Sequence, residues 1–459
     1  MTLLNETSQP SKTNSRKVAF AAFIGTTVEW YDFYIYSTAA ALIFSHTFFP
    51  PSTTPLAGLL GSFAAYGVGF FARPLGGIVA GHFGDRIGRK QVLVYSLVLM
   101  GIATLLTGLL PSYAVAGLWA PVLLVLLRLL QGLATGAEWG GASLLSVEHA
   151  TVKNRGFLGS FTQIGSAAGM LLASATFLIV KASLSGADFS SWGWRLPFLF
   201  SILLIAIGIF VRLRIDEPQA FLQAQAEGKI KRFPVAEVIR SYPRGLLVTI
   251  GLRLVQPAMY SILTTYALSY LALKRGDTTM ALTSVLIGSA AAIITTPFWA
   301  LLSDKIGRRG PAVFGIIGMG ILVWPFFLFL DRGNLLWLPL VVAAGLAIFD
   351  ASIYGPGAAW FSEQFPTEVR YSGVSIGYQV GTLISGGLTP FIATYLFSIG
   401  GGSPWLISAF ISFYAVLSLF AAFAAKDPVR DNRRALLDIH GSSADTDYAA
   451  QPINSQDLL

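Results

Sequence analysis

The sequence contains no cysteine, and charged residues make up only 12% of its 459 residues. The absence of cysteine excludes disulfide bonds, thiol catalysis and thiolate-bound metals. Soluble proteins carry about 25% charged residues, so the low charge and the hydrophobic content of 54% exclude an ordinary soluble protein. No Gly-x-x-x-x-Gly-Lys-Ser/Thr phosphate loop occurs, and the four histidines lack metal-ligand spacing. We therefore expect no metal, no cofactor and no enzymatic activity.

Long apolar runs occupy most of the chain instead, and the mean hydropathy is +0.65. A helix needs about 20 apolar residues to cross a hydrocarbon core roughly 30 Å thick. The sequence predicts twelve such spans, at 18–44, 57–82, 91–111, 117–145, 156–180, 194–213, 245–272, 281–302, 311–330, 335–361, 372–398 and 404–425.

The basic residues are distributed unevenly between the predicted loops. Most of the 31 Lys and Arg lie in the N-terminal tail, in the loops after even-numbered spans or in the C-terminal tail. Cytoplasmic loops of membrane proteins carry such an excess of Lys and Arg. The pattern predicts that both termini are cytoplasmic. It also accounts for the net charge of +8 without any nucleic-acid partner. The residues that fall on the opposite side are Lys181, Arg195, Lys274, Arg275 and Arg332.

One polar sequence occurs twice, nearly half the chain apart. Gly81-His-Phe-Gly-Asp85-Arg86-Ile-Gly88-Arg89-Lys90 follows the second predicted span, and Ala300-Leu-Leu-Ser-Asp304-Lys305-Ile-Gly307-Arg308-Arg309 follows the eighth. Internal repetition indicates two similar halves, which in membrane proteins is typical of transporters that move one half against the other.

The predicted fold class is therefore an all-α polytopic membrane protein with 12 transmembrane helices in two six-helix bundles. Its predicted parts are a cytoplasmic N-tail (1–17), an N-terminal bundle (18–213), a cytoplasmic linker (214–244), a C-terminal bundle (245–425) and a cytoplasmic C-tail (426–459) that is charged and predicted to be disordered.

These motifs resemble the major facilitator superfamily over residues 16–426. The repeated loop and Arg128-x-x-Gln131-Gly132 match two signatures of that superfamily. The resemblance extends to its metabolite:proton symporter branch, whose members import shikimate, 2-oxoglutarate, citrate, proline or glycine betaine into bacteria. Within that branch the sequence motifs most resemble those of shikimate carriers. The motifs that carry the branch resemblance are Glu29-Trp30-Tyr31-Asp32-Phe33, Ala72-Arg73-Pro74-Leu75-Gly76-Gly77, Trp192-Gly193-Trp194-Arg195-Leu-Pro197-Phe198 and Phe365-Pro366-Thr367-x-Val369-Arg370-Tyr371-Ser372-Gly373.

Charged residues inside spans are costly, at least 2.5–3.5 kcal/mol at a helix centre on insertion scales, so they indicate function by default. We expect Asp32 to carry the transported proton, with Arg128 as its partner across the contact between spans 1 and 4. The alternative is a static buried pair that fixes packing. Glu29, Arg73 and Glu138 are predicted to form a second network at similar depth. Its two acids are further candidates for proton coupling, and a structural role is the alternative. The seven candidates are Glu29, Asp32, Arg73, Arg128, Glu138, Arg253 and Asp350.

Arg253 lies inside span 7 with no acid nearby in the sequence. A guanidinium fork suits bidentate binding of a carboxylate, so we expect Arg253 to clamp an anionic substrate; the rival is an ion pair with Asp350. Other candidate substrate contacts lie at membrane depth. They are the charged residues Arg73 and Asp350 and the polar or aromatic residues Gln163, Gln256, Tyr260 and Tyr354.

The two polar loops are predicted to form a cytoplasmic gate that holds the outward-facing state closed on the inside. The alternative is that the loops only set topology. The gate residues are Asp85, Arg86, Gly88, Arg89, Asp304, Lys305 and Arg308.

We predict a proton symporter of the bacterial inner membrane that acts as a monomer and imports a small organic anion, such as shikimate or a di- or tricarboxylate, by alternating access. Its predicted partners are this anion, protons and the lipid bilayer. Two alternatives remain at this stage: a carrier of proline or glycine betaine, and a membrane sensor that binds ligand without transport.

Overall fold

The computed structural model describes residues 12–50, 54–87, 89–136, 154–213, 234–276, 278–366 and 369–431. Within these ranges the chain is helical and contains no strand. The helices of the first half are α1 (Lys12–Ala39), α2 (Ser45–Thr47), α3 (Pro55–Ile87), α4 (Arg89–Leu109), α5 (Tyr113–Ala116), α6 (Trp119–Gly136), α8 (Arg155–Ser183), α9 (Gly186–Ser191) and α10 (Leu196–Leu213). Those of the second half are α12 (Pro234–Ser241), α13 (Pro243–Leu252), α14 (Val255–Ser261), α15 (Ala267–Arg275), α16 (Thr279–Ile306), α17 (Arg309–Arg332), α18 (Leu338–Ala343), α19 (Ala351–Ser362), α20 (Arg370–Thr382), α21 (Thr389–Ile399) and α22 (Trp405–Ala424).

Ten helical segments of the described residues are long and apolar enough to cross a membrane. They coincide with ten of the twelve spans predicted from the sequence. The other two predicted spans correspond to α1, which carries Glu29 and Asp32, and to α4, whose apolar part is the shorter segment Val94–Leu109. The helical class is confirmed, and the number of twelve crossings stays a prediction.

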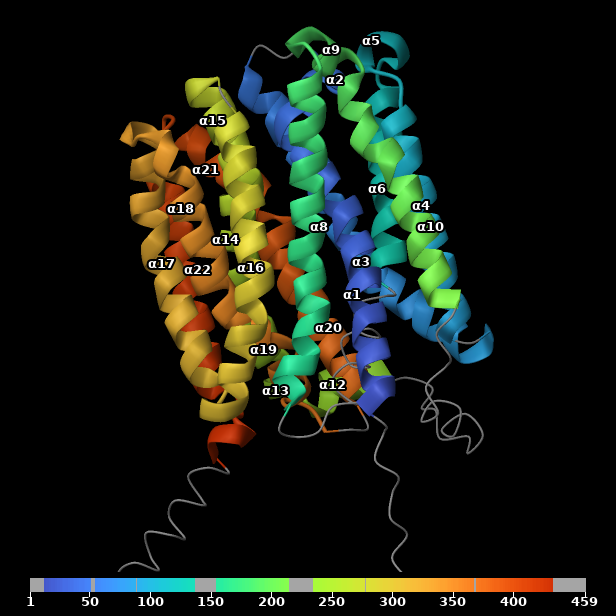
Figure 1. Cartoon of the computed structure of the whole chain (residues 1–459), viewed down its shortest axis with the longest axis vertical. Coiled ribbons are helices and arrows are strands. Elements are labelled where there is room, and N and C mark those ends of the chain that lie inside the picture. The colour runs from blue at the N-terminus through green and yellow to red at the C-terminus, as the bar shows by residue number, and fades with distance from the viewer. Residues whose placement is uncertain are drawn as a thin grey trace, which may run out of the picture.

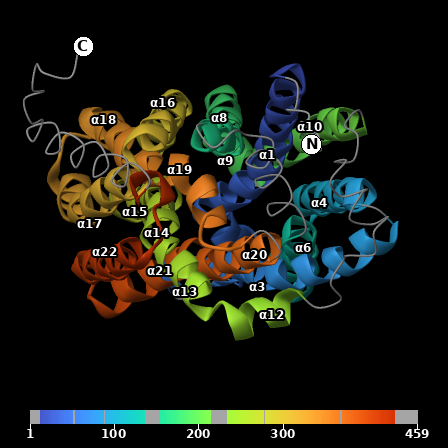
Figure 2. The same cartoon turned by 90° about the horizontal axis from the view of Figure 1, so that it is seen from below.

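The helices form two groups that lie side by side (Figure 1). Helices α1 to α10 occupy one side and α13 to α22 the other. Seen along the bundle, α8 lies beside α16 and α19 on one face, and α3 lies beside α20 and α21 on the opposite face (Figure 2). The beginning of α1 and the end of the described chain lie at the same end of the bundle, the lower end in Figure 1.

Helices α3 and α6 of the first group approach each other so closely that only glycine fits between them. A Cβ added at Gly132 would overlap the carbonyl oxygen of Gly69, and one at Gly136 would overlap that of Arg73. A Cβ at Gly76 would overlap the carbonyl oxygen of Leu133 in the same way. Small residues permit such backbone contact between membrane helices, where lipid offers no hydrophobic driving force. This contact fixes α6, and with it Arg128, against α3.

Helices that face the centre are interrupted there. The chain between α13 and α14 leaves helical geometry at Arg253, and α14 continues into the π-helical segment η4 (Ile262–Tyr266). Two more π-helical segments, η6 (Ala344–Asp350) and η7 (Leu383–Gly387), interrupt the helices that lead into α19 and α21. Such interruptions are frequent at functional sites because they turn side chains and backbone groups out of the regular pattern. Asp350 is the last residue of η6.

Candidate functional site

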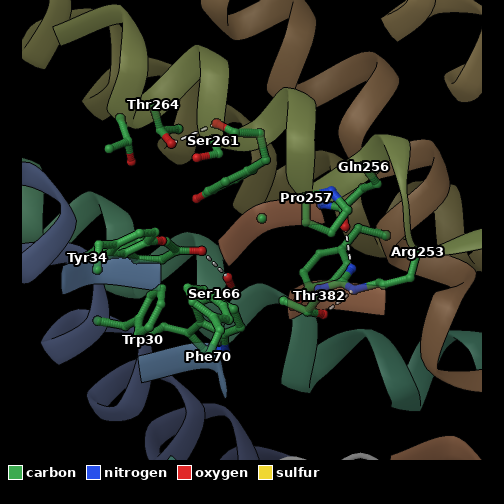
Figure 3. A pocket seen from close by; sticks show the side chains of 16 residues that line it. Trp30, Tyr34, Phe70, Ser166, Arg253, Gln256, Pro257, Ser261, Thr264 and Thr382 are labelled. Carbon is green, nitrogen blue, oxygen red and sulfur yellow. Dashed lines mark hydrogen bonds between the residues drawn. The ribbon is translucent and has the colours of Figure 1, made fainter. Parts of the chain in front are cut away.

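A cavity lies between the two groups of helices. The space open to the centres of water molecules is about 40 Å³, enough for about three waters at 10–15 Å³ each. A ligand of metabolite size would therefore have to push its walls apart. Arg253, Gln256 and Thr382 lie at one end, and Trp30 and Tyr34 at the other (Figure 3). The residues that line the cavity are Trp30, Phe33, Tyr34, Tyr66, Phe70, Ser166, Arg253, Gln256, Pro257, Tyr260, Ser261, Thr264, Thr265, Tyr354, Thr382 and Gly386.

Arg253 is 3% exposed, and polar neutral groups hold it in place. Its Nε donates to Thr382 Oγ1 at 3.1 Å, its Nη2 donates to Tyr378 Oη at 2.6 Å, and its Nη1 donates to Gln256 Oε1. The guanidinium also lies 4.1 Å from the centre of the Tyr378 ring. A guanidinium has five N–H donors, so two remain, and an arginine that lines a cavity with free donors can bind a carboxylate.

Gln256 connects Arg253 to Asp350. Its Nε2 donates to Asp350 Oδ1 at 2.6 Å while its Oε1 accepts from Arg253. Asp350 is 4% exposed. Arg253 and Asp350, whose direct ion pair was the rival to the substrate clamp, are thus joined through the Gln256 amide. Arg253 and Gln256 line the cavity.

Asp32 lies in a comparable chain of groups in the first half. Thr104 Oγ1 donates to Asp32 Oδ2 at 3.1 Å, Gln131 Nε2 donates to Thr104 Oγ1 at 2.9 Å, and Arg128 Nη1 donates to Gln131 Oε1 at 2.5 Å. The expected Asp32–Arg128 relation is therefore indirect in this structure. The carboxylate is fully buried, and its Oδ1 has no hydrogen-bond partner among the described residues.

Aromatic rings surround the buried arginines of the first half. The Arg128 guanidinium lies 4.0 Å from the centre of the Tyr36 ring and 4.4 Å from that of Phe33, and Arg73 lies 4.5 Å from Phe33. Cation–π contacts of this kind compensate part of the lost hydration of a cation. Glu29 acts electrostatically on Arg73. Glu138, the third predicted member of that network, lies outside the described residues.

The cavity wall contains polar groups without a hydrogen-bond partner in the described part of the chain. The hydroxyls of Tyr260 and Tyr354 contact those of Tyr34 and Tyr378. The groups without a partner in that part of the chain are Ser261 Oγ and Trp30 Nε1. Buried polar groups are normally paired, so these atoms are free to bind a ligand with several hydroxyl or carboxylate oxygens. Gln163 lies beside the cavity, where its Nε2 donates across the two halves to the Tyr354 carbonyl oxygen at 3.1 Å.

The second polar loop joins the two halves at the lower end of Figure 1. Asp304 Oδ1 accepts from the backbone N–H of Gly156 at 2.9 Å, and its Oδ2 accepts from that of Phe157 at 3.0 Å. A carboxylate at the first N–H groups of a helix, here α8, is favoured by both hydrogen bonds and the helix dipole. Arg308 forms ion pairs with Asp304 at 2.6 Å and with Glu363 at 3.2 Å. We call Asp304, Arg308, Glu363 and the start of α8 the latch.

The upper end of the same pair of helices is also held together. Lys181 Nζ, near the end of α8, donates to Thr278 Oγ1 at 2.7 Å and to Thr279 Oγ1 at 3.0 Å at the start of α16. The α8–α16 contact is thus fixed at both ends, which agrees with the small volume of the cavity between the halves. Lys305 is exposed beside the latch. Of the first loop, Gly88 and the side chains of Asp85, Arg86 and Arg89 lie outside the described residues.

Gly156→Ala is expected to open the latch. The added Cβ would lie 2.6 Å from Arg308 Nη1, 2.8 Å from Asp304 Oδ1 and 3.0 Å from the backbone oxygen of Ala300, so α8 and α16 must separate. A cysteine pair is introduced at the start of α8 and the end of α16, with and without Gly156→Ala. The pair should cross-link less when Gly156→Ala is present, and the sequence has no native cysteine that could react instead. Gly186→Ala, where a Cβ meets nothing within 4 Å, is the control. Equal cross-linking in Gly156→Ala and the parent would contradict the role of the latch.

The latch is also expected to depend on pH. Burial raises the pKa of Glu363 above its ordinary value of 4.5, although the Arg308 guanidinium opposes this. A carboxylate that separates from the latch returns to that ordinary value, so the closed latch binds a proton more tightly than the open one. Closure is therefore favoured by acid and weakens as the pH rises through the raised pKa of Glu363. Cross-linking of the same cysteine pair should fall over this range, and Glu363→Gln, which stays neutral, should remove the dependence. A pH profile unchanged by Glu363→Gln would assign the dependence to another group.

Four polar residues of these networks were missed by sequence reasoning. Thr104, Tyr378 and Thr382 look like ordinary residues of apolar helices, and nothing in one sequence separates a hydroxyl that binds a charge from one that bonds its own backbone. Glu363 lies at the end of α19 among loop residues.

Helices of membrane length around a largely aromatic cavity that contains a buried arginine are typical of membrane transporters. The chain belongs to the major facilitator superfamily. The family model described as "Major Facilitator Superfamily" matches residues 278–444, and the one described as "Sugar (and other) transporter" matches residues 18–233. The recognition of this family from the sequence is confirmed, as is the expectation that the chain is a transporter and not an enzyme.

Similar proteins are known from Escherichia coli strain K12. The shikimate transporter is 38% identical over 424 residues, which cover 92% of this chain and 96% of that protein. The inner membrane metabolite transport protein YhjE is 39% identical and is aligned over 86% of this chain and 91% of its own. The proline/betaine transporter is 33% identical over 83% of this chain and 77% of its own. The chain is accordingly a multi-pass protein of the bacterial inner membrane.

Solved structures of the same fold include a D-xylose-proton symporter, with a TM-score of 0.67 and 18% identity over 89% of this chain and 96% of that one. The xylose transporter XylE from E. coli in a partially occluded, inward-open conformation has a TM-score of 0.67 and 19% identity over 90% of this chain and 97% of its own. At this identity the likeness concerns the fold alone.

Proposed function

We propose that the protein is a proton-coupled symporter that imports a small organic anion, with shikimate as the first candidate. The observation that carries the proposal is Arg253, a buried arginine at the wall of a cavity between the halves, of whose five N–H donors three have partners among the described residues. Relatives named as transporters of shikimate and other metabolites support the class of substrate.

The proposed topology has twelve spans with both termini in the cytoplasm and two bundles, 18–213 and 245–425, joined by the linker 214–244. The common end of the described termini and the excess of basic residues in the corresponding loops support this arrangement. The latch then lies on the cytoplasmic side, where it would close the cavity from the cell interior. The bundles would rock about the cavity in one monomer.

The proposed binding mode places the substrate carboxylate on Arg253 and the substrate hydroxyls near Tyr260, Tyr354 and Ser261. A molecule with one carboxylate and several hydroxyl groups matches this division of the wall into a cationic end and a neutral, hydrogen-bonding remainder. Gln256 and Gln163 would add amide donors. Asp32 and Arg128 would couple the proton from behind the aromatic rings of Phe33, Tyr36 and Tyr66.

A second candidate is a zwitterion such as proline or glycine betaine. The rings of Trp30 and Tyr34 stack 5.1 Å apart, and Tyr34 lies 5.7 Å from Tyr260. Aromatic clusters bind quaternary ammonium groups, and the relative named as a proline/betaine transporter supports this alternative.

Proton influx into vesicles that contain the protein and an internal pH dye tests the proposal. Shikimate, 2-oxoglutarate, citrate, proline and glycine betaine are added one at a time to vesicles without an imposed gradient. Acidification by an acid of the panel, and none in vesicles without the protein, is the expected result. Acidification by betaine or proline alone would replace the anion with the zwitterion, and binding without acidification would indicate a sensor.

A further inference from the structure

Both halves of the protein contain the same arrangement of an arginine, a glutamine three residues later and an aspartate. In each, the arginine Nη1 donates to the glutamine Oε1. The glutamine Nε2 then donates toward the acid, directly to Asp350 in the second half and through Thr104 to Asp32 in the first. We call these the Asp350 relay and the Asp32 relay.

The two relays differ in their access to the cavity. Arg253 and Gln256 of the Asp350 relay line the cavity, whereas no member of the Asp32 relay does. A ligand in the cavity can therefore touch the cationic end of the Asp350 relay, and it cannot touch Asp32 without rearrangement of the rings in front of it. If one acid responds to the charge of the bound substrate, the geometry favours Asp350.

Among the residues that the structure describes, few charged or titratable groups act on Asp350. Arg253 and Tyr260 act on it from the segment around α14, and Tyr354 lies one turn further along its own helix. Helices α16 and α17, which pack against η6, have charged side chains only near their ends, and α18 has none. Those end residues are Asp304, Lys305, Arg309, Asp331 and Arg332. Arg253 is thus the cation that balances the charge of Asp350.

We propose that Asp350 takes up a proton when an organic carboxylate binds to Arg253, so that substrate binding itself creates a second protonation site. This inference rests on the proposed function. An anion bound to Arg253 neutralises the positive charge that balances the Asp350 carboxylate. A buried carboxylate without a balancing charge is strongly unfavourable. A proton from the aqueous phase on one oxygen of Asp350 restores neutrality.

Gln256 provides a way to connect the two events. When the substrate carboxylate takes over the Arg253 Nη1 hydrogen that Gln256 Oε1 accepts in this structure, Gln256 loses its donor. Rotation of the amide by half a turn places Oε1 toward Asp350, where it accepts the new carboxyl O–H, and turns Nε2 toward the substrate carboxylate. Every donor and acceptor is then satisfied in both states, with one proton taken from water and no other bond made or broken.

Calorimetric titration of the purified protein tests this inference. Shikimate is titrated into the protein at a mildly alkaline pH in several buffers that differ in ionisation enthalpy, and the dependence of the heat on the buffer gives the protons taken up per molecule bound. The parent protein and Asp32→Asn should each take up a proton on binding. Asp350→Asn should bind shikimate without proton uptake, and Asp350→Glu should restore it.

Gln256→Met serves as a second variant, because it keeps the size of the side chain and removes the amide; it should also lose the uptake while size-exclusion chromatography reports a folded protein. Uptake by Asp350→Asn equal to that of the parent, or no uptake by the parent, would overturn the inference and leave symport standing. Failure of shikimate, citrate and 2-oxoglutarate all to bind would overturn the anion assignment itself, together with this inference.

Discussion

Arg253→Lys is expected to raise the substrate concentration for half-maximal uptake by about 10- to 100-fold. Hydrogen bonds to charged groups contribute about 1.5–3 kcal/mol, and each 1.4 kcal/mol corresponds to a factor of about ten. Lysine keeps the charge but lacks the planar fork that holds Thr382, Gln256 and Tyr378 and still offers two parallel N–H groups to a carboxylate. Arg253→Gln, which also removes the charge, should cost more. Initial rates of uptake over a range of shikimate concentrations measure both effects.

Arg195→Lys is the matched control for this prediction. Arg195 is half-buried and donates to the carbonyl oxygens of Gly108 and Leu110, away from the cavity. Its replacement should leave the half-maximal concentration unchanged. If Arg253→Lys behaved like Arg195→Lys, Arg253 would be a structural arginine that holds α20 and Gln256 in place, and the substrate carboxylate would have to bind elsewhere.

The spans and the family could be predicted because both depend on local sequence. Apolar runs of membrane length and a polar loop repeated around Asp85 and Asp304 are properties of short stretches of chain. The list of buried charges was accessible for the same reason, since a charge inside an apolar run is visible without a structure. Six of the seven charges lie in the described residues, and the structure buries all six.

The connections between those charges could not be predicted, because they depend on how the helices rotate and approach. Asp32 and Arg128 suggested a direct pair, and the structure inserts Thr104 and Gln131 between them. For Arg253 the sequence suggested either an ion pair with Asp350 or a clamp for the substrate carboxylate. In the structure Gln256 bonds to both residues, so Arg253 is linked to Asp350 and still lines the cavity. Amides and hydroxyls of apolar helices are too common for one sequence to indicate which of them bridge two charges.

The same argument applies to the latch. The sequence indicated Asp304 and Arg308 as gate residues, and it contained no information that α8 begins where the Asp304 carboxylate can accept from Gly156 and Phe157. That contact is between backbone N–H groups and a side chain, so it has no signature in residue types. Glycine at position 156 was its one trace in the sequence.

Asp32→Asn is expected to lower the accumulation of substrate against a gradient by the contribution of one proton, while exchange of substrate across the membrane continues. A single charge moved through 100 mV supplies about 2.3 kcal/mol, so loss of one coupled proton lowers the attainable accumulation about 50-fold per 100 mV. Asparagine keeps the size of the side chain and can still accept from Thr104, so the fold and the cavity should persist. Uptake driven by an imposed proton gradient and exchange of labelled for unlabelled substrate, measured in the same vesicles, separate coupling from binding.

Asp331→Asn is the control for this variant, because Asp331 is an acid at the end of α17 that accepts from Tyr270 outside the cavity. It should accumulate substrate like the parent. Equal accumulation by Asp32→Asn and the parent would reduce the Asp32 relay to a packing element. The Asp350 relay would then be the remaining candidate for coupling. Loss of both accumulation and exchange would instead mean that Asp32 is needed for the halves to move, because a buried acid joined to α4 and α6 by Thr104 and Gln131 also holds three helices together.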